Sequence, residues 1–281
     1  MAGRVLRNLL RAMGRVFPDC VTLCQAIAFN MFLAFFPMLL FALGLVAGTS
    51  FFRDALREIP NRLRLILPPS STEVVFAFFV RKSVHPWRWV VLGFAAMLAA
   101  GTQVMVGFIE GFRVIEGDLL RPGYWRRQAR ALGLLCLTIV PIVAVVIVTV
   151  FGKQTRGWLS HYFASARVIH HLELMLYVSG VFLLAMGVLT VIYRIGRPGH
   201  PGYRALLPGA AVATVLWWAV DIGFGWYVRR TPYEVVYRGL AGAIGLLLWM
   251  FLTAIIVLLG AAYNAEAREA CAARKSPRHS S

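Results

Sequence analysis

The chain has 281 residues, of which 59% are hydrophobic and only 15% are charged, a composition outside the range of soluble globular proteins. Its formal net charge is +17, from 29 Lys and Arg against 12 Asp and Glu. In a soluble protein such an excess indicates nucleic acid. Here the basic residues are scattered between long apolar segments, as is typical of residues that flank membrane spans and meet anionic headgroups. We therefore expect membrane lipids as partners, with anionic headgroups at the inner leaflet, and no nucleic acid.

Residues 1–19 predict a short amphipathic helix, because at about 100° per residue its basic side chains share one stripe and aliphatic side chains cover the other face. The basic residues are Arg4, Arg7, Arg11 and Arg15. This pattern is typical of a helix lying in the membrane interface, and a mitochondrial-type targeting segment shares it. We favour the interfacial helix, because Pro18-Asp19 provides a break directly before the first apolar segment.

Six charge-poor segments follow, and each is long enough to cross a hydrocarbon core of about 30 Å at about 1.5 Å per helical residue. They are Cys20–Phe52, Trp89–Ile109, Ala131–Gly152, Leu174–Tyr193, Ala205–Val228 and Gly239–Ala265. The predicted fold is therefore all-α: a polytopic bundle of six transmembrane helices over residues 20–265, with interfacial amphipathic helices.

The loop at residues 49–88 is the one sizeable extramembrane segment that the sequence predicts. After Pro68-Pro69 it offers a capping box at Ser70–Glu73, which predicts a short helix over Val74–Val80. That helix is too short to span, so we expect it in the interface or over the bundle as a lid. Residues 266–281 are expected to form a disordered cytoplasmic tail.

Charge bias predicts the orientation. With the N-terminus inside, 16 of the 29 Lys and Arg residues lie in inner segments and 13 in outer ones, and basic residues favour the cytoplasmic side. We therefore predict a multi-pass membrane protein with both termini in the cytoplasm. All four cysteines fall towards the inner side in this topology, so no structural disulfide is expected.

Polar residues in or near the spans are the candidate functional residues, because each costs free energy there unless it is paired or hydrated. They are Asn30, Gln103, Glu110 and Asp221, with Asn264 and Glu266 after the last span. We hypothesise that several of them line a cavity open to one side. Asp221 either serves a substrate or coupling ion there, or pairs with a nearby cation such as Arg229 or Arg230. The helix kinks expected at Pro37, Pro141 and Pro208 would help to admit water.

The sequence has no phosphate-binding glycine loop, no GxSxG elbow and no HExxH motif. We therefore predict no catalytic residues, no cofactor and no metal site, and that the protein is not an enzyme. Small residues at four-residue spacing, such as Gly107 with Gly111, are typical of close helix packing, and a homo-oligomer is the alternative.

Three stretches of the chain resemble the YihY/virulence factor BrkB family. Ala26–Gly44 is similar to its AxAFxxxLxxFPxLL span, Arg204–Val228 to its LPGAxxAxxLW span, and Tyr237–Glu266 to its closing signature. The resemblance implies a six-span inner-membrane protein with cytoplasmic termini and an association with virulence and serum resistance. Ala262 stands where the family usually has Glu, so an activity of that glutamate would be lost or would use Glu266.

Three functions compete at this point. A transporter or a lipid- or envelope-handling protein accounts for the intramembrane polar residues and kinked spans, and we favour it. A non-enzymatic envelope or virulence-associated factor accounts for the small-residue faces. A membrane-tethered ribonuclease accounts only for the basic charge, and we regard the ribonuclease BN label of some family members as a misassignment.

Cysteine-accessibility labelling tests the predicted topology. Ser276→Cys should react only with a reagent applied from the cytoplasmic side, and Ser71→Cys only with one applied from outside, because an odd number of spans separates them. Labelling of both positions from the same side contradicts six spans.

Overall fold

The computed structural model describes residues 2–47, 86–118, 123–159, 166–197, 199, 202–230 and 240–275. Within these ranges all regular structure is helical, which confirms the all-α prediction. The helices are α1 (Ala2–Asp19), α2 (Val21–Ala47), α5 (Pro86–Glu116), α6 (Tyr124–Leu159), α7 (Ala166–Gly196), α8 (Tyr203–Arg230) and α9 (Leu240–Lys275). The helix expected over Val74–Val80 lies outside the described residues.

Five of these helices contain segments long and apolar enough to cross a membrane. The segments are Val21–Phe41, Val90–Glu116, Val178–Gly196, Tyr203–Tyr227 and Gly242–Ala272. The predicted third span, Ala131–Gly152, lies in α6 and is not one of the five, although α6 is 36 residues long. The side chains of α6 beyond Pro141 lie outside the described part. The chain is thus a multi-pass helical membrane protein, and the count of six spans stays a prediction.

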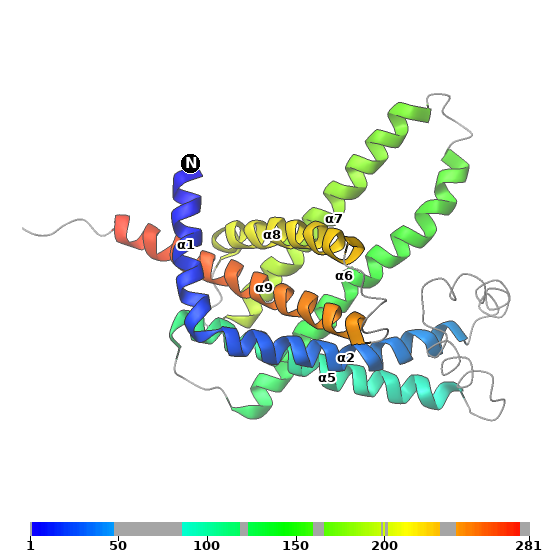
Figure 1. The fold of residues 1–281 in the computed structure, drawn as a ribbon, viewed down its shortest axis with the longest axis horizontal. Helices are drawn as coiled ribbons and strands as arrows, with labels where there is room; N and C mark the ends of the chain where they lie inside the picture. Colours follow the sequence, from blue (N-terminus) through cyan, green and yellow to red (C-terminus); the bar gives the residue numbers. More distant parts are fainter. Residues whose placement is uncertain are drawn as a thin grey trace, which may run out of the picture.

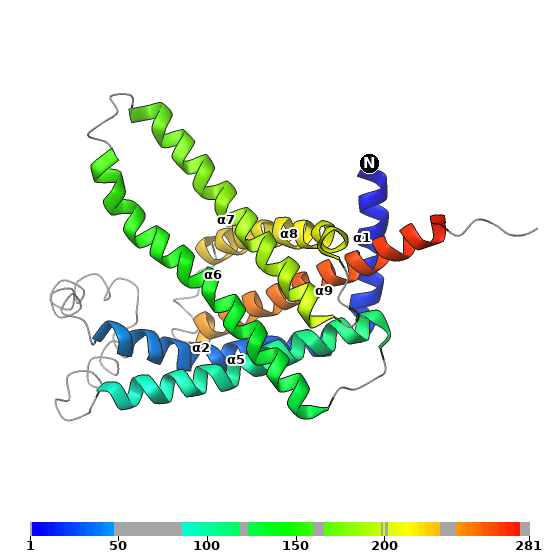
Figure 2. The same cartoon turned by 180° about the vertical axis from the view of Figure 1, so that it is seen from behind.

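The spans form a bundle with two helices that lean away from it. α2 lies along α5 and also contacts α9, which packs on its other side against α8 (Figure 1). α6 and α7 diverge from these helices towards the ends that are farthest from α1 (Figure 2). The buried core is densest on the second half of α9, where every residue from Leu258 to Glu266 is buried.

The first helix lies across the direction of α2 and α5 instead of continuing it (Figures 1 and 2). It packs by Ala12 and Val16, both buried, and its main neighbour is α9. α9 continues to Lys275, so residues 266–275 are helical and the prediction of a disordered tail is wrong for them. This extension and α1 therefore lie at the same end of the bundle, called the α1 end below.

Glycines let α5 lie directly against two neighbours. A Cβ added at Gly107 would lie 2.6 Å from Ile27 Cγ1 on α2, and one at Gly111 would lie 2.7 Å from Leu258 Cδ2 on α9. Both distances are too short for a carbon–carbon contact. This small-residue spacing is thus used for packing inside the chain.

The crossing of α8 and α9 is closer still. A Cβ at Gly209 would lie 2.1 Å from the carbonyl oxygen of Gly260, and one at Gly260 would lie 2.4 Å from Tyr193 Oη on α7. Each glycine faces the other helix where the two backbones meet. Three helices therefore meet at a point that has no room for a methyl group.

Gly209→Ala should destabilise the protein, because the added methyl group forces α8 and α9 apart. The expected loss is about 1–3 kcal/mol, the usual range for overpacking, and is measured as a lower midpoint of thermal unfolding in detergent. Gly223→Ala is the matched control on α8, because a Cβ there meets nothing within 4 Å. Equal midpoints for the two variants would contradict the close crossing.

Candidate functional site

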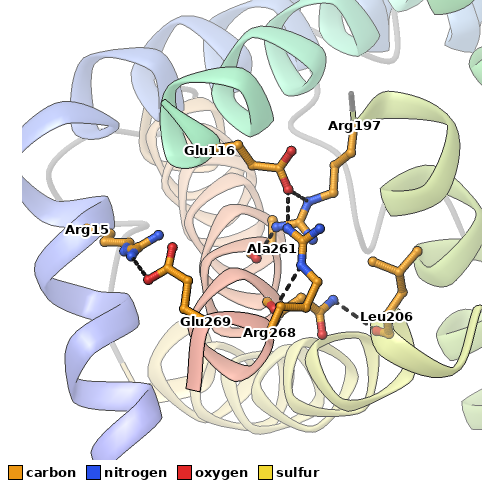
Figure 3. A network of polar contacts seen from close by, with 8 residues as sticks. Arg15, Glu116, Arg197, Leu206, Ala261, Arg268 and Glu269 are labelled. Atoms are coloured by element: carbon orange, nitrogen blue, oxygen red, sulfur yellow. Dashed lines mark hydrogen bonds and ion pairs between the residues drawn. The ribbon is translucent and has the colours of Figure 1, made fainter. Parts of the chain in front are cut away.

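A charged cluster joins α5, α7 and α9 at the α1 end of the bundle (Figure 3). Its centre is Arg197, the residue directly after α7, whose side chain is fully buried. Arg197 Nε lies 3.1 Å from Glu116 Oε1, and its Nη2 donates a hydrogen bond of 2.5 Å to the carbonyl of Ala261. Arg268 of α9 binds the same oxygen of Glu116. One carboxylate is thus shared by two guanidinium groups from different helices.

Electrostatics explains why Glu116 needs both arginines. It is the last residue of α5, where the helix dipole disfavours a negative charge. Burial lowers the pKa of Arg197 to about 10, and the nearby carboxylate of Glu116 opposes this shift. Arg197 therefore remains a cation at neutral pH. Its Nη1 is buried and has no hydrogen-bond partner in the part of the chain that the structure describes.

Two donors at the end of α7, Tyr193 within the helix and Arg197 directly after it, bind successive turns of α9. The hydroxyl of Tyr193 donates to the carbonyl of Val257 at 2.8 Å, and Arg197, four residues on, donates to Ala261, also four residues on. The equal spacing shows that the two helices run in the same direction here, one turn matching one turn. α7 is therefore held in register on α9.

Asn264, a predicted site residue, joins α9 to α8. Its Oδ1 accepts a hydrogen bond of 2.7 Å from the N–H of Gly209, and its Nδ2 donates to the carbonyl of Leu206 at 2.9 Å. Pro208 lies between these two partners and has no N–H to donate. The fully buried amide of Asn264 is thus satisfied by the backbone of α8, at the proline that we had expected to kink the helix.

Glu266, also predicted, pairs with Arg15 of α1, and Figure 3 shows its neighbour Glu269 beside the same arginine. Arg15 Nε lies 2.6 Å from Glu266 Oε1, and Arg15 Nη2 lies 2.5 Å from Glu269 Oε2. Its hydrogen bond to Glu269 is the main cause that raises the pKa of Arg15. Arg15 therefore belongs to a contact between helices and not to a free basic stripe.

Glu110 pairs with two arginines and connects α5 to α6. Its carboxylate lies 2.9 Å from Arg113 Nη1 and 2.6 Å from Arg127 Nη1. Arg113 also donates to the carbonyl of Asp118 just after α5. These contacts join the end of α5 to the start of α6.

The remaining predicted residues lie apart from this cluster. Asp221 Oδ1 accepts a hydrogen bond of 2.7 Å from Trp249 Nε1 across α8 and α9; the side chains of Arg229 and Arg230, its expected partners, lie outside the described part. Asn30 is half-buried on α2, and Gln103 is exposed on α5. Four of the six predicted polar residues thus make separate contacts, and a cavity lined by several of them stays a prediction.

The described helices do form an apolar groove, between α6 and α7. Its volume is about 280 Å³, and it is lined by residues of both helices. Among them are Leu137, Pro141, Leu183, Gly187 and Val191. Pro141 is the predicted kink that borders it, whereas Pro37 of α2 faces Gly93 of α5. Within the described ranges, no three His, Cys, Asp or Glu side chains are grouped so as to hold a metal ion.

Comparison with known proteins identifies the family of this chain. The virulence factor BrkB family matches residues 17–281. The chain belongs to the virulence factor BrkB family. This confirms the resemblance and places Asn264 and Glu266, the two predicted residues of the closing signature, within the matched region.

Relatives of the BrkB-family chain carry general names. A "UPF0761 membrane protein" of Alkalilimnicola ehrlichii is 26% identical over 252 residues, which is 87% of this chain and 54% of that protein. One from Chromobacterium violaceum is 25% identical over 254 residues, 88% of this chain and 58% of that protein. A "Putative ribonuclease-like protein YfkH" of Bacillus subtilis is 26% identical over 125 residues, 44% of this chain and 46% of that protein. The chain thus spans little more than half the length of the first two. No solved structure matches it.

Sequence reasoning missed the centre of the cluster. In the sequence, Arg197 and Arg268 are two of the 16 basic residues of the inner segments, and Tyr193 is an aromatic residue at the end of a predicted span. Glu116 carries no signal of its own. A signal was present for Arg197, because it directly follows an apolar span and so lies within reach of the neighbouring helix ends. Burial of its side chain, however, depends on residues far away in the sequence.

Glu116→Gln tests the cluster, because it leaves the buried cation of Arg197 without its carboxylate. We expect the free energy of unfolding to fall by about 3–5 kcal/mol, as when one partner of a buried ion pair is removed. The double variant Glu116→Gln, Arg197→Gln should be more stable than the sum of the single losses predicts, because the unpaired charge is gone.

The matched control is Glu269→Gln, since the Glu269 side chain is 61% exposed. A loss of about 1 kcal/mol or less is expected there. Chemical unfolding in detergent measures the wild type, the single variants Glu116→Gln, Arg197→Gln and Glu269→Gln, and the double variant. A Glu116→Gln variant as stable as the wild type would show that the pair does not hold the helix ends together.

Proposed function

We propose that this BrkB-family chain is an inner-membrane protein that handles a lipid or another apolar component of the envelope, and that it acts without enzymatic chemistry. The observation that carries the proposal is the contrast between its polar and apolar interior surfaces. The polar side chains bind other parts of the protein, whereas the groove between α6 and α7 is apolar.

The proposed topology has six spans and both termini in the cytoplasm. α1 and the extension of α9 are in contact through Arg15, Glu266 and Glu269, so they lie on one side of the membrane. An even number of crossings connects two segments on one side. Counting α6 with the five apolar segments gives six, and the bias of basic residues favours the cytoplasm for that side.

The pairing of polar residues argues against a polar solute. Asp221 is hydrogen-bonded to Trp249, and Asn264 is hydrogen-bonded to the backbone of α8. Such hydrogen bonds between membrane helices stabilise packing. A pathway for polar solutes would need groups that face water within the spans, and these two residues are used otherwise.

The size and place of the groove favour an acyl chain. At about 280 Å³ it is near the lower limit of small-molecule sites, so one chain fits it better than a whole lipid. The groove is lined by α6 and α7. These are the two helices that lean away from the bundle (Figure 2). A lipid could therefore place one chain in the groove from the surrounding bilayer while its headgroup stays in the interface.

The alternatives have weaker support. A non-enzymatic envelope or virulence factor that associates through small-residue faces would need those faces to be free, but Gly107 and Gly111 contact Ile27 and Leu258 inside the chain. The word "ribonuclease-like" belongs to the Bacillus subtilis relative, over less than half of this chain. We propose no nuclease activity, since no three His, Cys, Asp or Glu side chains among the described residues are grouped so as to hold a metal ion.

Gly187→Leu tests the proposal, because a Cβ at Gly187 meets nothing within 4 Å and a leucine there fills the groove. Mass spectrometry should find at least about threefold less phospholipid bound to the purified variant, since the displaced chain loses its apolar contacts. Gly180→Leu is the matched control on α7, where a Cβ also meets open space but the residue does not line the groove. Equal lipid retention in the wild type and both variants would overturn the proposal.

A further inference from the structure

The first helix has three faces where the sequence pattern alone shows two. Ala12 and Val16 are buried and pack the helix onto its neighbours. A second face carries the basic residues. A third carries large apolar side chains at spacings of four, three and four residues, all exposed: Leu6 (59%), Leu10 (60%), Met13 (37%) and Phe17 (53%). This third face, the apolar stripe, is not covered by any described part of the chain.

The position of α1 places this stripe at the membrane surface. α1 ends at Asp19 and the first apolar span begins at Val21, so that only Cys20 lies between them. α1 also lies across the direction of that span (Figure 1). A helix that crosses the end of a span at its first residue runs along the plane of the bilayer. An exposed apolar stripe there meets the boundary between headgroups and acyl chains.

The basic face is divided between two roles. Arg15 is held by Glu266 and Glu269, so its charge is already compensated by α9. Arg11 lies one turn before Arg15 and Arg7 lies two turns before it, and both side chains are exposed. An anionic lipid surface attracts such residues when they lie within a Debye length of the headgroups.

We propose that α1 is a docking surface for the anionic leaflet of the membrane that the chain spans, in which Arg7 and Arg11 contact lipid headgroups and Arg15 clamps the helix to α9. The apolar stripe sets the depth of the helix, and the clamp sets its orientation relative to the bundle. The docking surface deepens the proposed function, because it names anionic lipids as the partner at the α1 end. Its role in lipid handling rests on that proposed function. The docking itself does not depend on the groove.

Hydrogen exchange of the full-length protein tests the assignment. The protein is placed in nanodiscs of phosphatidylcholine alone, or of phosphatidylcholine mixed with phosphatidylglycerol, and exchange is followed over residues 2–19. Phosphatidylglycerol should slow the exchange of α1 in the wild type by about tenfold or more, because each basic residue adds attraction to the anionic surface. High salt should remove the difference.

The variants separate the two roles. Arg7→Glu with Arg11→Glu should lose the effect of phosphatidylglycerol, and Arg7→Lys with Arg11→Lys should keep it. Arg15→Glu should speed exchange in both kinds of nanodisc and retain the response to phosphatidylglycerol. Adding Glu266→Arg and Glu269→Arg to Arg15→Glu should restore slow exchange, because the clamp is rebuilt with reversed charges.

Exchange of α1 that is the same in both kinds of nanodisc for the wild type would overturn the proposal, and so would a response that survives Arg7→Glu with Arg11→Glu. In either case the stripe would serve another occupant, such as a second protein. The groove is tested by lipid retention in Gly187→Leu, so loss of one result leaves the other in place.

Discussion

The buried cation of Arg197 is the constraint on which the α1 end of this protein depends. A charge without access to water needs a counterion and hydrogen-bond acceptors close by. Glu116 provides the counterion from α5, and the carbonyl of Ala261 provides an acceptor from α9. Because these groups come from three parts of the chain, the ends of α5 and α7 must meet at the turn of α9 that contains Ala261. The same side chain that costs free energy to bury thereby restricts how the helices can be arranged.

α9 meets this constraint because it has a small residue, Gly260, where α7 and α8 approach it most closely. Gly260 leaves room for Tyr193 and for the backbone of Gly209, and Asn264, one turn later, satisfies two backbone groups of α8. In a membrane, apolar burial alone does not favour one helix arrangement over another, since lipid tails are as apolar as leucine. Close backbone contact and paired polar groups must then define the packing. The closing signature of the BrkB family supplies both on one helix.

The sequence was sufficient to predict what depends on local composition. Apolar length predicts spans such as Gly239–Ala265 without any knowledge of neighbours, and the structure has a helix at each predicted span. The partners of polar residues were not predictable in this way. Asp221 is bound by Trp249, and Arg197 by Glu116, each pair joined only by the arrangement of helices. The free-energy cost of a polar group in a span shows that the group needs a partner, but it does not show which one.

The use of arginine shows how one composition serves three purposes at different stages. During insertion the helices are not yet packed, so the Lys and Arg residues close to the ends of the spans influence orientation whatever partners they later acquire. Once the bundle forms, Arg15, Arg127 and Arg197 acquire carboxylate partners, and their charge no longer faces the lipid. Arg7 and Arg11 have no carboxylate partner among the described residues and remain exposed. The 29 Lys and Arg residues therefore overstate the number of free cations that the folded protein presents to its surroundings, because several of them are paired with carboxylates. What matters for a lipid surface is the smaller set of cations left over after packing, and on α1 that set lies beside the apolar stripe.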